Sequence, residues 1–130
     1  ILGLDPNRVA LLAAVMEKKL GMHLMSYDIF MNVAGGVKVT EPAMDMAIVA
    51  AVASSFLDKA VSDNTVVLGE IGLTGEVRAI GQADTRIGES RKMGFSRCLL
   101  PKSNLKRLPD IDGIEIEGVK TVSEVVENLF

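Results

Sequence analysis

The chain has 130 residues, which is enough for one folded domain with a buried core. Hydrophobic residues make up 48% of the chain and charged residues 24%, an ordinary composition for a soluble globular protein. The net charge of −3, taken alone, argues mildly against a nucleic-acid partner.

Three features of the sequence bear on location. The longest near-continuous apolar run, from Ala43 to Leu57, is shorter than the roughly 20 residues that a membrane-spanning helix needs. No basic segment followed by an apolar one opens the chain, so we expect neither export nor a membrane partner. The one cysteine, Cys98, excludes an internal disulfide and an all-cysteine metal site, which fits the cytoplasm that we expect. Because the chain begins at Ile1, we expect a fragment of a longer protein.

The first predicted element is an amphipathic helix that follows Asp5. Asp5 can cap this helix, Pro6 suits its first turn, and Gly21 is placed to end it. Apolar residues recur at spacings of three and four along it, namely Val9, Leu12, Met16 and Leu20.

Two strands and a second helix are predicted next. The segment from Asp28 to Ala34 and the alternating segment from Val37 to Thr40 have the composition of strands. A helix is predicted from about Ala43 to Leu57. Because this helix is apolar nearly all round, we expect it to be the buried central helix of the domain.

The middle of the chain predicts a β-hairpin and a third helix. The hairpin joins strands over Val66–Ile71 and Glu76–Ile80 through four turn residues, Gly72-Leu73-Thr74-Gly75. These glycines do not form a phosphate-binding loop, because no Gly-Lys-Ser/Thr follows and the next element is a strand. The third helix should cover about Ala83–Met93 and stop at Gly94.

The last part of the chain predicts two strands and a final helix. The strands cover Arg97–Leu100, ended by Pro101, and Ile114–Val119. Thr121 and Glu124 have the spacing of a capping box. The final helix should bury three apolar residues, Val125, Val126 and Leu129. The mixture of helices and strands indicates one α/β domain over residues 1–130.

Charge is unevenly distributed along the chain. Between Arg86 and Arg107 lie seven basic residues and one acidic residue, Glu89, so this segment carries +6 and the rest of the chain −9. Such an asymmetry can be a binding face for polyanions or simply a solvated helix and loop. Only Phe95 in this stretch could stack on bases.

The single histidine and the single cysteine are the first residues to consider for nucleophilic chemistry. His23 stands alone without an acidic partner at triad spacing, so we interpret it as a surface or packing residue. Cys98 lies in an apolar run and is interpreted as inert core.

Two stretches form a recognisable combination: GEIGLTGEVRAIG at residues 69–81 and, after the third helix, CLLPK at residues 98–102. Together they resemble the core of Lon-type protease domains. In those proteins a buried helix begins with Gly-Pro-Ser-Ala-Gly, whose serine is the nucleophile, and a lysine in a later helix is its base. Here the helix opens with EPAMD, which puts Ala43 at the serine position. The lysine position falls on Arg86, and Leu68 replaces a usual threonine.

These departures remove both halves of the dyad that the resemblance implies. Ala43 has no hydroxyl to attack a carbonyl. Arg86 stays charged, because the intrinsic pKa of a guanidinium is above about 12, and so it cannot take a proton. We therefore expect no catalytic residues in this chain.

Two further questions concern this site. A relocated dyad would have to use other serines and lysines, for which the candidates are Ser54, Ser55, Lys59, Ser90 and Lys92. For Arg86 we predict an ion pair with Glu41 or Asp45 at the start of the second helix. The alternative is that Arg86 points outward and joins the basic face.

Three segments narrow the resemblance further: GLDPNR at 3–8, VAGGVK at 33–38 with EPA at 41–43, and GEIGLTGEVR at 69–78. They resemble the Lon-like domain of the RadA (Sms) family of bacterial DNA-repair proteins over essentially the whole chain. The resemblance implies a Lon-protease-like, ribosomal protein S5 domain 2-like fold, with a mixed sheet packed by helices. It implies a longer, DNA-dependent ATPase parent with a RecA-like ATPase core and a zinc module, which would hold ATP and zinc; we expect no cofactor or metal in this domain.

The same resemblance suggests what the domain does. Proteins of this family process branched intermediates on single-stranded DNA beside the RecA recombinase, and the Lon-like domain is thought to help form a hexameric ring and to contact DNA. Candidate DNA-binding residues are the cations Arg91, Lys92, Lys102, Lys106 and Arg107. The alternatives are a Lon-like serine peptidase with a displaced dyad and an oligomerisation scaffold without DNA contact.

Overall fold

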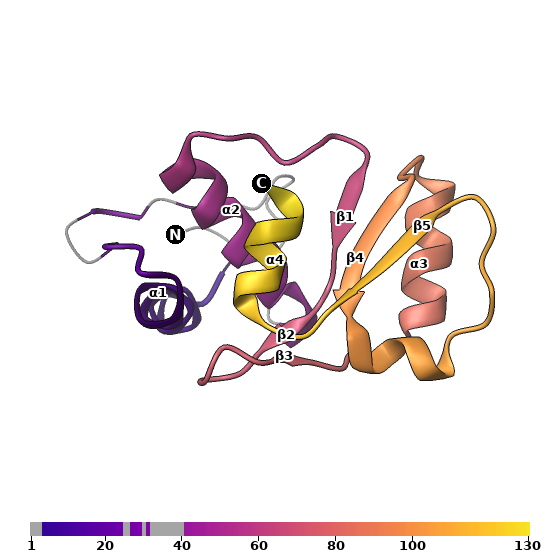
Figure 1. The fold of residues 1–130 in the computed structure, drawn as a ribbon, viewed down its shortest axis with the longest axis horizontal. Helices are drawn as coiled ribbons and strands as arrows, with labels where there is room; N and C mark the ends of the chain where they lie inside the picture. The colour runs from indigo at the N-terminus through magenta and orange to yellow at the C-terminus, as the bar shows by residue number, and fades with distance from the viewer. Residues whose placement is uncertain (1–3, 25–26, 30, 32–40) are drawn as a thin grey trace.

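A computed structural model of the chain describes residues 4–24, 27–29, 31 and 41–130. In chain order its elements are α1 (Pro6–Leu20), the 3-10 helix η1 (Pro42–Met44), α2 (Asp45–Leu57), β1 (Thr65–Val67), β2 (Glu70–Ile71), β3 (Val77–Arg78), α3 (Ala83–Lys92), β4 (Arg97–Pro101), the 3-10 helix η2 (Lys102–Arg107), β5 (Glu115–Val119) and α4 (Val122–Leu129). The α3 helix lies on one side of the main sheet, and α1, α2 and α4 lie on the other (Figure 1).

The main sheet is parallel, with β4 in the centre between β1 and β5. Side chains of β4 alternate between two cores: Leu99 packs among α1, α2 and α4, whereas Cys98 and Leu100 pack toward α3. All three side chains are fully buried. A parallel sheet covered by helices on both faces has this continuous apolar pattern, and the α/β fold class predicted from the sequence is confirmed.

The helical layer is built around α2, as the sequence predicts. Met46, Val49 and Ala53 are fully buried between the sheet and the neighbouring helices. Ala51, in the middle of α2, and Phe56, near its carboxyl end, are exposed, so the helix is less completely enclosed than its composition suggests.

The predicted strand Val66–Ile71 is broken into β1 and β2. Gly69 turns away from the sheet and joins the start of α2: its N–H donates to Ala43 O (2.9 Å), and its own carbonyl accepts from Met46 N (3.0 Å). A side chain at Gly69 would overlap Met46 Sδ, because an added Cβ would lie well inside van der Waals contact with it. The glycine therefore permits the close approach of β-structure to α2.

The hairpin lies where it was predicted but is short. The β2 and β3 strands pair antiparallel and form a ribbon separate from the parallel sheet, so the parallel and antiparallel pairs do not share one mixed sheet within the described residues. The second strand is confined to Val77–Arg78 instead of Glu76–Ile80. The N–H of Val77 donates to Lys120 O (2.8 Å), and beyond the strand the N–H of Ile80 donates to the Asn104 side chain (3.0 Å) instead of a neighbouring strand.

The helix ends follow the predicted chemistry. The Asp5 side chain accepts from Asn7 N, and Gly21 ends α1 in the left-handed conformation. At α4 the Thr121 hydroxyl accepts from Glu124 N, while the Glu124 carboxylate accepts from Lys120 N, one residue earlier than in an ideal capping box. In α4, Val125 is buried, and the predicted core residues Val126 and Leu129 are half-buried.

Some predicted elements fall outside the described residues. They are the strand Val37–Thr40 and, of the strand Asp28–Ala34, residues 30 and 32–34; the described residues 28, 29 and 31 are not in a strand. The sequence did not predict η2, which follows Pro101 directly. None of the helices in the described part of the chain is long and apolar enough to cross a membrane.

Candidate functional site

Ala43, the residue that the sequence resemblance puts at the nucleophile position, lies in η1 at the start of α2. It is only 5% exposed. Its carbonyl accepts from Gly69 N, which fixes the backbone of η1 against the turn between β1 and β2. The side chain at this buried position is a methyl group, which offers no hydroxyl for nucleophilic catalysis.

Arg86, at the expected base position, reaches the same region from α3. Its Nη2 donates to Glu41 Oε1, two residues before Ala43, and its Nε donates to Gly81 O (2.8 Å). The hydrogen bond from Arg86 lowers the pKa of Glu41. Of the two carboxylates expected as partners of Arg86, the structure thus pairs it with Glu41 and not with Asp45. These two hydrogen bonds connect the start of α3 to the residues before α2, and they engage the charge of Arg86 within the domain.

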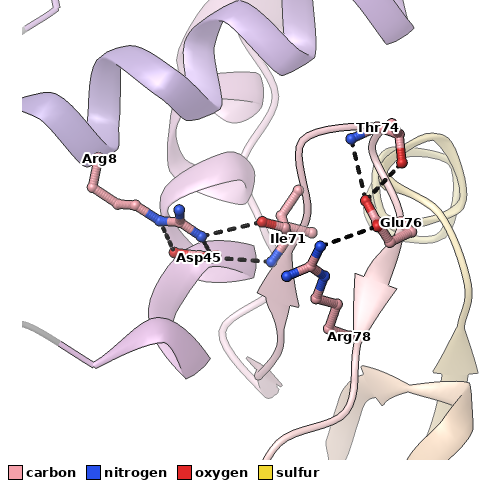
Figure 2. A network of polar contacts seen from close by, with 6 residues as sticks. All are labelled: Arg8, Asp45, Ile71, Thr74, Glu76 and Arg78. Carbon is pink, nitrogen blue, oxygen red and sulfur yellow. Dashed lines mark hydrogen bonds and ion pairs between the residues drawn. The ribbon is translucent and has the colours of Figure 1, made fainter.

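Asp45 belongs to a different ion pair, which sequence reasoning missed. Arg8 of α1 donates from Nε to Asp45 Oδ1 (3.0 Å) and from Nη2 to Oδ2, and the N–H of Ile71 also donates to Oδ2 (3.0 Å). Arg8 Nη2 donates further to Ile71 O (3.1 Å). Figure 2 shows how this network ties α1, α2 and β2 together. The hydrogen bond to Asp45 raises the pKa of Arg8 above its ordinary value.

The hairpin next to this network carries its own polar contacts. The Glu76 carboxylate accepts from the N–H and the hydroxyl of Thr74 and from Arg78 (Figure 2). The Thr74 hydroxyl, foremost among these donors, lowers the pKa of Glu76. These groups are exposed and stabilise the turn; among the described residues, no side-chain hydrogen bond joins them to Ala43 or Arg86.

The serines considered for a relocated dyad are not hydrogen-bonded to a lysine amine in the described residues. Ser54 Oγ donates to the main-chain oxygen of Lys59, and buried Ser90 donates to the main-chain oxygen of Arg86 (2.8 Å). The amine of Lys92 instead lies 3.5 Å from Glu89 Oε1. Across the part of the chain that the structure describes, no serine hydroxyl is hydrogen-bonded to a lysine amine.

The two other side chains considered for nucleophilic chemistry, His23 and Cys98, lie apart from the start of α2. The side chain of His23 is exposed at the surface, and Cys98 is fully buried. Burial raises the pKa of the Cys98 thiol to about 11. Within the described residues, no three His, Cys, Asp or Glu side chains gather in a way that could hold a metal ion.

The basic segment splits into two groups. Arg91 and Lys92 lie in the last turn of α3, whereas the other three candidates, Lys102, Lys106 and Arg107, all lie on η2 at the end of β4. In Figure 1, η2 is drawn in orange and lies near the amino end of α3, whereas Arg91 and Lys92 belong to the carboxyl end of that helix. The five cations therefore do not form one continuous face.

The two groups also differ in how their charges are engaged. Arg91 donates to Asp112 O (2.9 Å), and Lys92 faces Glu89. Arg97, also in the basic segment, pairs with Glu117 through two hydrogen bonds (2.7 and 3.2 Å). Among the described residues, no carboxylate lies within 4.0 Å of the three η2 cations. Their charge is thus available to a partner.

Comparison with known proteins places the chain in a family. The model of the Lon protease (S16) C-terminal proteolytic domain matches residues 11–130. The chain is 46% identical to the DNA repair protein RadA of Halalkalibacterium halodurans over 125 residues, which are 96% of this chain and 27% of that protein. Identity to RadA of Bacillus subtilis (strain 168) is 46% over 124 residues (95% and 27%), and to RadA of Streptococcus pneumoniae 41% over 128 residues (98% and 30%).

The chain spans less than a third of the length of these relatives. Its similarity to them nevertheless covers nearly every residue described above, including the start of α2 and the whole basic segment. The chain belongs to the family of Lon protease (S16) C-terminal proteolytic domains and corresponds to the Lon-like domain of RadA proteins.

Proposed function

We propose that the chain is a non-peptidase domain of a RadA-type DNA-repair protein, and that it contacts DNA through η2. The observation that carries the proposal is the start of α2, where a buried methyl group and a guanidinium engaged by Glu41 and Gly81 stand in place of a catalytic dyad. A site of this composition can hold the domain together but cannot form an acyl-enzyme.

The cations of η2 support the DNA contact. Lys102, Lys106 and Arg107 are exposed, lie within two turns of one short helix, and have no carboxylate partner among the described residues. Phosphate contacts that do not depend on sequence require only such placed cations. Arg91 and Lys92 are the second candidates, but Asp112 and Glu89 already engage them.

A peptidase assay tests the first half of the proposal. The purified chain should not hydrolyse casein or a fluorogenic peptide, and a serine-directed phosphonate should add no mass to it. Phosphonate labelling of Ser54, Ser55 or Ser90, accompanied by peptide hydrolysis, would establish the rival function of a Lon-like peptidase with a displaced dyad.

A DNA-binding titration tests the second half. The triple variant Lys102→Gln, Lys106→Gln and Arg107→Gln should bind a fluorescent single strand less tightly than the original chain. Each lost phosphate contact on a single strand lowers the salt slope by about 0.7, so three contacts should lower it by about 2.

A matched control separates these contacts from net charge. The exposed residues Lys18, Lys59 and Lys120 lie outside the basic segment, and their replacement by Gln removes the same charge. This control should retain most of the affinity and salt slope. Equal behaviour of the two triple variants would contradict the η2 assignment and would favour a scaffold without DNA contact.

The wider role belongs to the longer protein and is part of the same proposal. There the domain would help to form a hexameric ring that acts on single-stranded or branched DNA beside a RecA recombinase in the cytoplasm. A neighbouring ATPase domain would bind ATP, and a separate module would bind zinc. Light scattering of the longer protein, with and without residues 1–130, tests whether the domain contributes to the ring.

A further inference from the structure

A hollow of about 560 Å³ lies between η2 and the turn that leads into α3. One wall is formed by the turn and the first residues of α3, from Ala79 to Asp84, and the other by η2 and Leu108. Its volume falls within the range of roughly 300 to 1,000 Å³ that is usual for small-molecule sites. Neither the Lon-type chemistry nor the phosphate contacts described above account for it.

The two walls are braced against each other and against the core. The Asn104 side chain of η2 accepts from Ile80 N (3.0 Å) and donates to Ile80 O (2.9 Å). Arg86 donates to the neighbouring carbonyl of Gly81 (2.8 Å). The shape of the hollow is therefore set before any ligand arrives, which reduces the entropy lost on binding.

The hollow has opposite charges on its two walls. Lys106 and Arg107 line it from η2, and Asp84 lines it from the first turn of α3. Ile80 and Leu108, which pack on the core beneath α3, add an apolar surface between them. A simple anion would be repelled by Asp84, so a complementary ligand needs an anionic end, an apolar body and hydrogen-bond donors.

We propose that the hollow takes one nucleotide of a DNA single strand. Its phosphate would lie at Lys106 and Arg107, its base against Ile80 and Leu108, and an exocyclic amino group of the base at Asp84. The inference rests on the proposed DNA contact of η2 and names the ligand that the hollow would bind. A base inside a duplex is stacked and paired and cannot enter, so the hollow selects single strands.

The base chemistry makes the proposal specific. Cytosine and adenine carry exocyclic amino groups that can donate a hydrogen bond to a carboxylate, whereas thymine presents a carbonyl oxygen at that position. The chain should therefore bind a deoxycytidine hexamer several-fold more tightly than a thymidine hexamer. The variant Asp84→Asn should lose most of this preference while binding both hexamers.

The test uses nuclear magnetic resonance titration of the 130-residue chain with these hexamers. Ser103 is exposed and lines the hollow, so Ser103→Trp fills it without changing charge. Ser55→Trp places the same side chain at an exposed position of α2, away from the hollow. We expect Ser103→Trp to weaken binding of the cytidine hexamer at least fivefold, with amide shifts at Ala83 and Asp84 lost, and Ser55→Trp to have no such effect.

The outcomes separate this inference from the proposed function. If the η2 triple variant loses affinity but Ser103→Trp binds normally, the DNA contact stands and the nucleotide site is wrong. If neither variant changes affinity, both are wrong. Deoxycytidine monophosphate serves as the free-nucleotide probe, and binding as tight as that of the hexamer would overturn the assignment to a strand. A folded Ser103→Trp spectrum, apart from local shifts, shows that lost binding does not reflect unfolding.

Discussion

The start of α2 and η2 both concentrate charged side chains, but they treat them in opposite ways. Asp45 is 1% exposed and accepts hydrogen bonds from both Arg8 and Ile71. In η2 no residue is buried, and its three cations have no carboxylate partner among the described residues. Buried charges that form ion pairs with one another keep the elements of the fold together, whereas exposed charges without a partner remain available for a ligand.

The largest change in stability that we predict from this contrast is at Asp45. Removing one partner of a buried ion pair leaves the other charge and the bonded N–H unsatisfied, which typically costs about 3–5 kcal/mol. Arg8 is partly exposed, so we expect Asp45→Ala to lower the free energy of unfolding by about 3 kcal/mol, at the lower end of that range. Urea denaturation followed by circular dichroism measures it.

An exposed aspartate gives the matched control. Asp110→Ala removes the same side chain from a surface loop and should change the free energy of unfolding by less than about 0.5 kcal/mol. A similar small effect at Asp45 would mean that the network in Figure 2 contributes little to stability. The contrast between the start of α2 and η2 would then lose its energetic basis.

The network at Asp45 also shows where sequence reasoning reached its limit. The element types were predictable where a long pattern repeats, as in α1 and α2, or where local chemistry is explicit, as at the Thr121 cap. The ion pair of Arg8 with Asp45 was not predictable, because these residues are 37 positions apart and the sequence shows Arg8 only as part of the polar face of α1.

Two further features of the fold could not be predicted from the sequence, for physical reasons. The break between β1 and β2 depends on hydrogen bonds from Gly69 to the start of α2, which no strand pattern encodes. The six residues of η2 are too few and too polar for a helical repeat to be visible. The sequence therefore predicted that Arg86 reaches a carboxylate at the start of α2, as it does at Glu41, but it did not predict where the cations of η2 lie in space.

A second prediction concerns the contact that seats η2 on the sheet. At Gly118 of β5 an added Cβ would lie 2.7 Å from Leu105 Cδ1 and 2.9 Å from the Lys102 backbone. Because the backbone cannot move aside cheaply, Gly118→Ala should cost about 1–3 kcal/mol of stability, as overpacking usually does. Displacement of η2 should also weaken single-strand binding, although no charge is removed.

Gly88 provides the opposite control within the same molecule. It lies in α3 with open space around it, so Gly88→Ala should raise stability by about 0.5–1 kcal/mol through helix propensity and leave DNA binding unchanged. Amide chemical shifts of residues 102–107 report the position of η2. Unaltered shifts and binding in Gly118→Ala would show that η2 does not depend on this contact.

The smallest expected effect lies at Glu117, which is intermediate between the two regions because its side chain is 28% exposed. The two hydrogen bonds from Arg97 lower the pKa of Glu117 below its ordinary value of 4.5. A carboxylate whose pKa is lower in the folded state stabilises the fold above its unfolded pKa. That stabilisation disappears as the pH falls through the folded pKa. Since such part-exposed pairs contribute at most about 1 kcal/mol, Glu117→Gln should destabilise the chain by that amount or less at pH 7.

The difference between the two proteins should then shrink as the pH falls below 4.5, because protonated Glu117 and the glutamine that replaces it both lack the negative charge that Arg97 attracts. Urea denaturation at a series of pH values measures this convergence. Curves that stay parallel down to acid pH would show that the Arg97 pair adds no net stability. Convergence, together with the larger loss expected for Asp45→Ala, would instead show that an ion pair contributes more the less exposed its carboxylate is, because the side chain of Asp45 is 2% exposed and that of Glu117 28%.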